Sequence, residues 1–147
     1  MKRPWAALGL VLALSVIMPR HAEAQDKKTS SKPILGQNYP NPFNPEMSIP
    51  FTVGGYPQCP EAGKQYHITI ILYNIIGQVV GIPVLKGGSG SVSGGTPLDN
   101  VQLPCGEYTA FFNGRAQSNG REIASGIYPY TLSQDGVKVQ KKAIAAK

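Results

Sequence analysis

The stretch from Gly36 to Pro45 constrains the fold of this chain more than any other segment. It reads Gly-Gln-Asn-Tyr-Pro-Asn-Pro-Phe-Asn-Pro, with three prolines within six residues. Proline has no backbone N–H and biases the preceding residue toward extended backbone, so this segment cannot form a helix. Its asparagines favour Asx-type turns. We expect an ordered but irregular segment from which Tyr39 and Phe43 insert into a core.

The composition extends the argument against helices to the whole chain. The 147 residues include 17 glycines and 13 prolines, and only 15% of residues are charged. Glycine and proline interrupt helices, which argues against a helix bundle. The glycines follow no three-residue period, which excludes a collagen-like chain, and 41% hydrophobic residues are enough to require a core. The length fits one domain.

Short alternating segments separated by glycine, proline and asparagine turns predict strands. The strongest runs from Tyr66 to Tyr73; its second face is also partly apolar, so we expect it to be central. Pro50 cannot donate a ladder hydrogen bond, which predicts an edge position for its strand. The expected strands are 48–53, 66–73, 79–85, 98–103, 107–112, 127–133 and 137–144, the last two forming a hairpin around Asp135-Gly136. This pattern predicts an all-β, immunoglobulin-like or fibronectin-III-like antiparallel sandwich of about seven strands.

The first residues have the features of a secretory signal peptide. Lys2 and Arg3 precede an apolar run from Trp5 to Met18, and Ala22-Glu23-Ala24 matches a signal peptidase site before Gln25. The alternative is a membrane anchor, but the run is shorter than the ~20 residues that span a bilayer. We therefore expect a signal peptide over 1–24, a flexible leader over 25–34 and a sandwich domain over 35–147. The exported protein would retain no membrane-spanning segment.

Cys59 and Cys105 are the two cysteines of the chain. Export places them in an oxidising compartment, where such a pair usually forms a disulfide. A redox-active pair would favour Cys-x-x-Cys spacing, which is absent, and a metal site would need more ligands than the chain offers. In a regular sandwich alternate loops lie at opposite ends, so we expect the bridge to require the loop from Gly54 to Lys64 to fold back along the sheets.

The residues give little support for catalysis. His67 alternates with apolar positions in its strand, which favours a surface or cross-strand histidine. The carboxylates are scattered, although a fold could still cluster Asp99, Glu107 or Glu122, and no nucleophile motif is present. We expect no enzyme activity, no cofactor and no metal. The basic residues lack aromatic interleaving, so a nucleic-acid partner is not expected.

Two further features have a functional and a structural interpretation. The glycine-rich stretch from Gly87 to Gly95 could cradle a phosphate, but both phosphate-binding spacings are missing and a linker is favoured. The strand tyrosines could form a carbohydrate-binding platform, but core packing is favoured. These are Tyr108, Tyr128 and Tyr130.

Several motifs give the chain a family resemblance. The segment Gln37, Asn38, Tyr39, Pro40, Asn41, Pro42, Phe43, Asn44 and Pro45, followed by Ile49-Pro50-Phe51, resembles the opening of type A C-terminal sorting domains of the type IX secretion system. FlgD-type Ig-like modules look similar. Tyr73-Asn74-Ile75-Ile76-Gly77-Gln78-Val79-Val80 and Ala124-Ser125-Gly126-Ile127-Tyr128-Pro129-Tyr130-Thr131-Leu132 resemble later family segments. Lys141, Lys142 and Lys147 resemble its closing lysine-containing strand.

The resemblance implies a non-catalytic recognition tag. After Sec export such a domain is recognised in the periplasm by the outer-membrane type IX machinery. Its passenger is carried to the cell surface, and the tag is often removed by a sortase-like protease. The implied partners are proteins of the secretion machinery or of a cell-surface assembly. We therefore expect an exported protein, in the periplasm during transit and then at the cell surface or extracellular.

Three functions remain open from the sequence. A sorting domain normally follows a large cargo, whereas about ten residues separate the expected cleavage site from Leu35. The first possibility is a stand-alone secreted module that uses the sorting-domain fold. The second is a structural or adhesive Ig-like module that binds partners through edge strands. The third is a small enzyme, which would need a cleft with convergent carboxylates around Asp99 or Glu107.

Overall fold

The computed structural model describes residues 31–147 as an all-β protein. The expected signal peptide and residues 25–30 of the expected leader lie outside the described residues. The strands are β1 (Ile34–Leu35), β2 (Met47–Val53), β3 (Gln65–Tyr73), β4 (Val79–Gly81), β5 (Val84–Leu85), β6 (Val101–Pro104), β7 (Gly106–Phe112), β8 (Gly126–Gln134) and β9 (Val137–Ala145). Within residues 31–147 there is no helix with the length and apolar character needed to cross a membrane.

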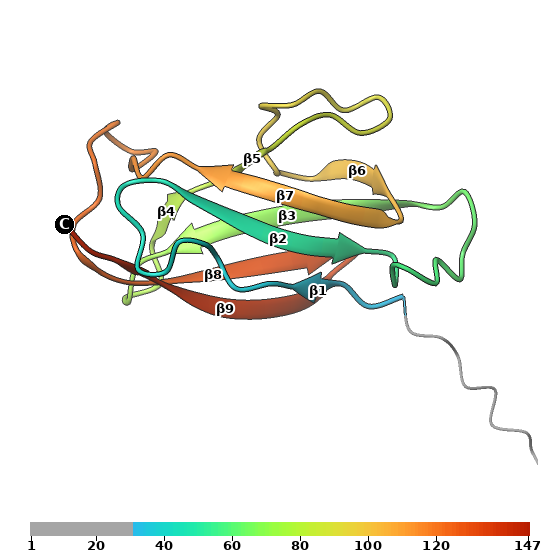
Figure 1. Ribbon diagram of the computed structural model, residues 1–147, viewed down its shortest axis with the longest axis horizontal. Coiled ribbons are helices and arrows are strands. Elements are labelled where there is room, and N and C mark those ends of the chain that lie inside the picture. The colour runs from blue at the N-terminus through green and yellow to red at the C-terminus, as the bar shows by residue number, and fades with distance from the viewer. Residues whose placement is uncertain (1–30) are drawn as a thin grey trace, which may run out of the picture.

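The strands form two antiparallel sheets that pack face to face (Figure 1). One sheet has the order β1-β2-β7-β5, and the other has the order β4-β3-β8-β9 with β6 also paired to β3. The expected sandwich is therefore confirmed. Within residues 31–147 it has nine strands instead of about seven, because the two-residue strand β1 is added and one expected strand is divided into β4 and β5.

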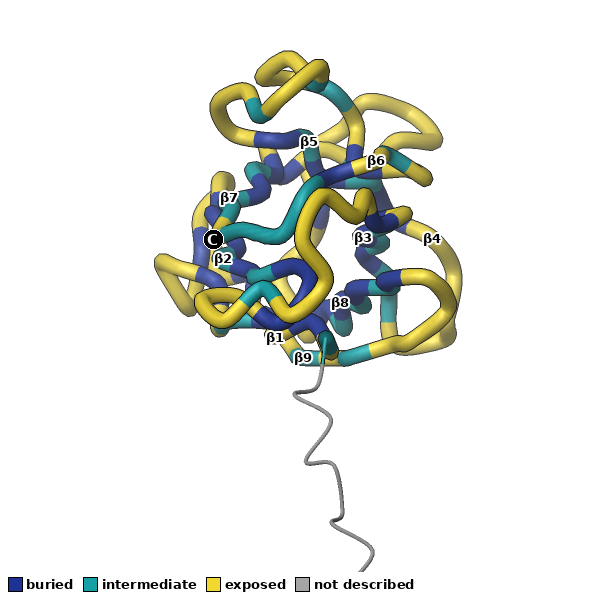
Figure 2. The backbone as a smooth tube through the Cα atoms, turned by 90° about the vertical axis from the view of Figure 1, so that its right-hand side faces the viewer, coloured by how far each residue is buried: buried dark blue, intermediate teal, exposed yellow. Residues whose placement is uncertain are grey.

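The core lies between the inner faces of the two sheets (Figure 2). In β3, alternate residues from Tyr66 to Leu72 are buried, as the sequence pattern predicts. This strand pairs with β8 on one side and with β4 and β6 on the other, so its central position is confirmed. The inner faces of β2, β7 and β8 supply a large part of the remaining core, including Ile49, Phe51, Val53, Ala110, Phe112, Tyr128, Tyr130 and Leu132.

The expected strand from Val79 to Leu85 is divided between the sheets. β4 pairs with β3 in one sheet, and β5 pairs with β7 in the other. The change occurs between Gly81 and Val84, where Pro83 cannot donate a ladder hydrogen bond. Gly81 also leaves room for the Phe112 ring, which lies only 2.8 Å from where a Cβ would stand. The proline therefore marks a change of sheet.

The prediction that Pro50 places its strand at an edge is wrong. β2 lies between β1 and β7, because Leu35 pairs with Phe51 and Ile34 pairs with Thr52. Ile34, which the sequence assigned to the leader, is the first residue of β1. A two-residue strand contributed by the N-terminal segment was not apparent from local periodicity.

Cys59 and Cys105 form a disulfide with a Cα–Cα distance of 5.7 Å. The expectation that the loop must fold back to make this bond is wrong. Gly106 pairs with Val53, so Cys105 lies beside the end of β2 where the cysteine-bearing loop begins. Pro104 pairs with Gln65 at the start of β3, so Cys105 also lies beside the point where this loop ends. Cross-linking over 46 residues stabilises the fold by roughly 4 kcal/mol in the chain-entropy model.

Candidate functional site

The segment Gln37–Pro45, called the motif segment below, joins the edges of the two sheets. Tyr39 exchanges two backbone hydrogen bonds of 2.9 Å with Ser48 at the start of β2. Phe43 forms a parallel bridge with Ala145 of β9. The segment therefore crosses one open side of the sandwich.

The hydroxyl of Tyr130 anchors the beginning of this crossing. Tyr130 is fully buried in β8 and donates a hydrogen bond to the Gly36 carbonyl at 2.9 Å. It accepts one from the Asn38 amide at 3.0 Å. Burial raises the pKa of Tyr130, although the Asn38 hydrogen bond opposes the shift. The hydroxyl thus remains a donor at neutral pH.

The Tyr130 hydroxyl takes the place of the backbone N–H that Pro50 lacks. The Gly36 amide donates to the Pro50 carbonyl at 2.7 Å. In a regular antiparallel pair Pro50 would donate back to Gly36, but proline has no N–H. The Tyr130 hydroxyl donates to the Gly36 carbonyl instead. Pro50 can therefore lie inside the sheet without leaving its neighbour's carbonyl unsatisfied.

Asn38 and Gln37 hold the next turn. Asn38 is buried, and its side-chain amide donates to the Pro40 carbonyl at 2.9 Å. The Gln37 side-chain amide donates to the Asn38 side chain at 2.7 Å and to the Lys142 carbonyl at 2.9 Å. The first part of the motif segment is thereby tied to β9.

Asn41 and Phe43 complete the attachment to β9. The Asn41 side chain accepts from the Ile144 amide at 3.0 Å, and the Phe43 amide donates to the Ile144 carbonyl at 2.8 Å. The Phe43 carbonyl accepts from the Ala146 amide at 3.0 Å. The buried Phe43 ring packs edge-to-face on Phe112, with centroids 6.4 Å apart. Asn41 is thus an edge cap for β9, a role that the Asx-turn prediction missed.

The motif segment leaves a compact exposed surface. Insertion of Phe43 into the core is confirmed, but Tyr39 is 52% exposed and its predicted insertion is wrong. Asn38 faces inward and the backbone of Tyr39 pairs with Ser48, so the neighbouring Tyr39 side chain faces solvent. The other exposed members are Gln37, Pro40, Asn41, Pro42, Asn44 and Pro45.

The three lysines of the closing strand have different environments. Lys142 is exposed on β9, and its carbonyl binds Gln37 of the motif segment. Lys141 is half-buried. Lys147 lies at the C-terminus, with its ammonium 3.6 Å from the Glu122 carboxylate. The fold brings Lys142 to the motif segment, while Lys147 pairs with the loop before β8.

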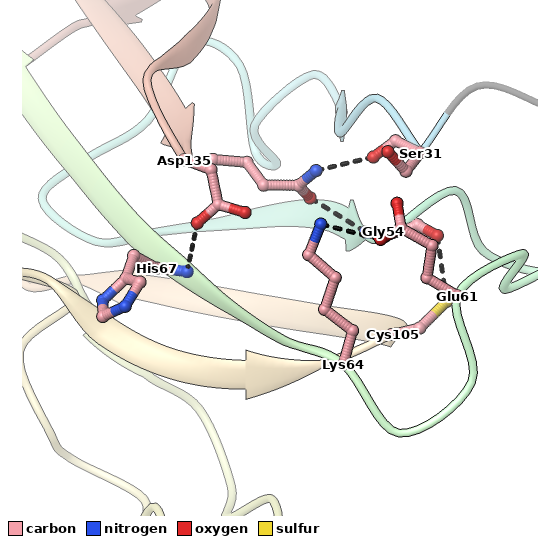
Figure 3. Close-up of polar contacts among 8 residues, drawn as sticks. Ser31, Gly54, Glu61, Lys64, His67, Cys105 and Asp135 are labelled. Atoms are coloured by element: carbon pink, nitrogen blue, oxygen red, sulfur yellow. Dashed lines mark hydrogen bonds and ion pairs between the residues drawn. The ribbon is translucent and has the colours of Figure 1, made fainter.

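The residues considered for catalysis do not converge on one place. His67 is exposed, and its imidazole lies beside Asn100 (3.1 Å), consistent with the cross-strand interpretation. Its amide donates to the Asp135 carboxylate (Figure 3). Glu107 pairs with Thr52 across the sheet, while Glu122 pairs with Lys147. Among residues 31–147 there is no group of three potential metal ligands.

An open hollow of about 640 Å³ lies beside the change of sheet. Its apolar wall includes Ile82, Val84 and Phe111. Asp99 is the single carboxylate along this wall, in the described part of the chain. The convergent carboxylates that the enzyme hypothesis needs are therefore not gathered in this hollow.

The strand tyrosines pack in the core, as favoured from the sequence. Tyr130 and Tyr128 are buried, and the Tyr128 hydroxyl donates to the Ala124 carbonyl at 2.7 Å. Tyr108 stacks on Phe51 with centroids 5.6 Å apart. The glycine-rich segment forms a turn in which the Ser89 and Val92 backbones pair.

Comparison of the chain with models of protein families, with curated proteins and with solved structures gives no match. The class defined by the fold is an antiparallel β-sandwich whose open side is crossed by a proline-rich segment.

Proposed function

We propose that the protein is a non-catalytic secreted Ig-like module that acts as an export and surface-targeting recognition domain. Its partner would be an outer-membrane machinery of the type IX kind. The protein would then pass through the periplasm and reach the cell surface. The proposal rests on the resemblance of the motif segment and closing strand to type A sorting domains.

One structural observation carries this proposal. The inward residues Asn38 and Phe43 fix the motif segment against β8 and β9 respectively, while Tyr39 stays 52% exposed between them. A rigid surface loses little conformational entropy when a partner binds. The exposed residues Pro40 and Pro42 follow Tyr39, and the exposed Lys142 lies on the strand to which the segment is attached. A receptor can therefore contact the motif segment and the closing strand at the same time on a folded domain.

The test is delivery of a reporter fused to this chain. It uses a bacterium that has the type IX translocon and an otherwise identical strain that lacks it. We expect protease-accessible reporter at the surface of the first strain alone. Tyr39→Ser should lower surface delivery severalfold and leave folded protein in the periplasm. Tyr56→Ser is the matched control, because Tyr56 is also exposed but lies in the disulfide loop.

Two results would overturn the proposal. One is equal surface delivery in both strains. The other is full delivery of a variant that combines Tyr39→Ser with Pro42→Ala, since both substituted residues are exposed. Tyr39→Ser is an exposed substitution of the kind that changes stability by less than about 0.5 kcal/mol. Replacing a proline also acts through the backbone, so circular dichroism of the double variant must show a folded protein before a loss of delivery is assigned to recognition.

A second candidate function, a structural or adhesive surface module, has its own supporting observation. Ile75 and Ile76 are 79% and 73% exposed at the β3–β4 turn. Asn74 orders this turn by accepting from the amides of Ile76 (3.1 Å) and Gln78 (2.9 Å). Under this alternative, replacing both isoleucines by serine would weaken attachment at the surface and leave export unchanged. Unchanged attachment would remove this candidate.

A further inference from the structure

The outer edge of β9 is covered along one half of its length. β9 ends its sheet, and the backbone groups of alternate residues point away from β8. At Ile144 both outward groups are bound by the motif segment, the amide by Asn41 and the carbonyl by Phe43. The Lys142 carbonyl is bound by Gln37. These contacts show that the even-numbered residues are the ones whose backbone N–H and C=O groups point away from β8.

The other half of this edge forms no hydrogen bonds in the described part of the chain, although Cα atoms of β1 lie within 8 Å of β9 (Figure 1). By the same alternation, the N–H and C=O groups of Lys138 and Gln140 and the N–H of Lys142 point outward. Within residues 31–147 these groups have no backbone or side-chain partner. The open groups have the spacing of a sheet ladder, so they form a template for one more strand.

The side chains beside the open edge determine which strand would fit. On the outer face of the sheet, Lys138, Gln140 and Lys142 are exposed. On the inner side, Val137 is 44% exposed, Val139 is half-buried against the core, and Lys141 is half-buried. Directly opposed opposite charges stabilise neighbouring strands, and apolar pairs do the same. A complementary strand would therefore alternate carboxylates on its outer side with branched apolar residues on its inner side.

The same lysines disfavour two other occupants. In an antiparallel pairing of two copies centred on Gln140, Lys138 of each copy would face Lys142 of the other. Such like-charge pairs destabilise a sheet. The residues just before Ser31 include Lys27 and Lys28, which would also bring positive charge to the edge. An acidic partner avoids both conflicts.

We propose that the open half of the β9 edge, from Lys138 to the amide of Lys142, binds an extended acidic segment of a partner protein. The segment adds as a sixth strand to the five-stranded sheet. Its backbone pairs with Lys138 and Gln140, and its glutamate or aspartate residues face Lys138 and Lys142. This site does not include the exposed motif residues and does not depend on the export role.

The experiment uses an isotope-labelled sample of the secreted protein and a short peptide of alternating valine and glutamate. NMR titration should shift the amides of Lys138, Gln140 and Lys142, and hydrogen exchange at these amides should slow. Affinity should fall as salt is raised, since the charge pairs are exposed. A peptide in which lysine replaces glutamate is the matched probe and should not bind.

Two variants separate strand addition from general charge attraction. Gln140→Pro removes one outward N–H and should lower affinity by about tenfold, the effect of one lost hydrogen bond. Gln140→Ala keeps the N–H and should bind normally. An edge strand tolerates proline whose nitrogen faces away from its neighbour. The double variant Lys138→Glu with Lys142→Glu, which keeps the backbone intact, should reject the glutamate peptide and bind the lysine peptide.

Three outcomes would overturn the inference. The first is equal binding of the glutamate and lysine peptides, and the second is equal peptide affinity for Gln140→Pro and Gln140→Ala. The third is slow hydrogen exchange at Lys138, Gln140 and Lys142 before peptide is added. That result would mean that a second copy or the residues before Ser31 already cover the edge. None of these outcomes bears on surface delivery of the Tyr39 variant, so this inference and the export proposal can fail separately.

Discussion

The two halves of the β9 edge carry the same backbone chemistry but are treated differently by the rest of the chain. From the Lys142 carbonyl to Ala146, the motif segment occupies the outward groups with both side-chain and backbone partners. From Lys138 to the Lys142 amide, the outward groups have no partner within residues 31–147, and lysines flank them. An uncovered edge invites unwanted pairing, and lysine is a common deterrent. The motif segment thus covers one half of the edge, and flanking lysines disfavour unwanted pairing at the other half.

Removing the apolar anchor of the covered half should have the largest effect. Phe43→Ala would empty a site that is 1% exposed and lose the contact with Phe112. We expect the free energy of unfolding to fall by about 3–5 kcal/mol, as for other buried phenylalanines. Urea denaturation measures the change. A loss below about 1 kcal/mol would mean that the motif segment is not an integral part of the core.

Removing the Tyr130 hydroxyl should have the next largest effect. Tyr130→Phe leaves the Gly36 carbonyl and the Asn38 amide without their partner. Buried groups left unsatisfied cost about 1–3 kcal/mol. Tyr66→Phe is the matched control, because the buried Tyr66 hydroxyl has no hydrogen-bond partner among residues 31–147. That variant should leave stability unchanged or raise it, because it removes a buried hydroxyl that is already unsatisfied. Equal losses would contradict the anchoring role of Tyr130.

The pH dependence should report the same hydroxyl. Burial raises the pKa of Tyr130 above the ordinary value of 10.0. Above that value the unfolded chain loses the proton more readily than the folded protein, so alkaline pH favours unfolding. The contribution is fully present below pH ~10 and is lost as the pH rises through the raised pKa. Tyr130→Phe should flatten the alkaline decline in stability in part, because burial also raises the pKa of Tyr66 and Tyr128.

Uncapping the edge at Asn41 should produce the smallest effect on stability. Asn41→Ala removes the acceptor for the Ile144 amide, at an expected cost of about 0.5–1.5 kcal/mol. Hydrogen exchange at Ile144 should accelerate, while the neighbouring Ala145 amide, which points toward β8, should stay protected. Asn44→Ala is the control, since Asn44 is exposed on the same segment. Unchanged exchange at Ile144 would show that the contact does not cap the edge.

Residue alternation and turn residues correctly predicted those features of the fold that are set by neighbouring residues in the sequence. Alternation in Tyr66–Tyr73 placed β3 at the centre, and Asp135-Gly136 marked the final hairpin. The position of Pro50 was mispredicted because its sheet neighbour is Gly36, and because the missing donor is replaced by a tyrosine 94 residues away from that glycine. Periodicity carries no information about such a distant partner.

In the candidate site too, features set by neighbouring residues were predictable, whereas features set by distant partners were not. The proline spacing predicted an ordered turn, and Phe43 was correctly expected in the core. The inward and outward directions of Asn38 and Tyr39 follow from pairing with Ser48, which depends on the tertiary fold. The covering of half of the β9 edge was equally invisible, since Asn41 and Ile144 are 103 residues apart in the chain.

Hydrogen exchange along β9 in the free protein tests the central claim most directly. The odd-numbered amides point toward β8 and should exchange slowly over the whole strand. Among the even-numbered amides, Ile144 and Ala146 should be protected, whereas Lys138, Gln140 and Lys142 should exchange rapidly. Uniform protection of the even-numbered amides, or exchange of Ile144 as fast as that of Lys138, would contradict the division of this edge into a covered and an open half.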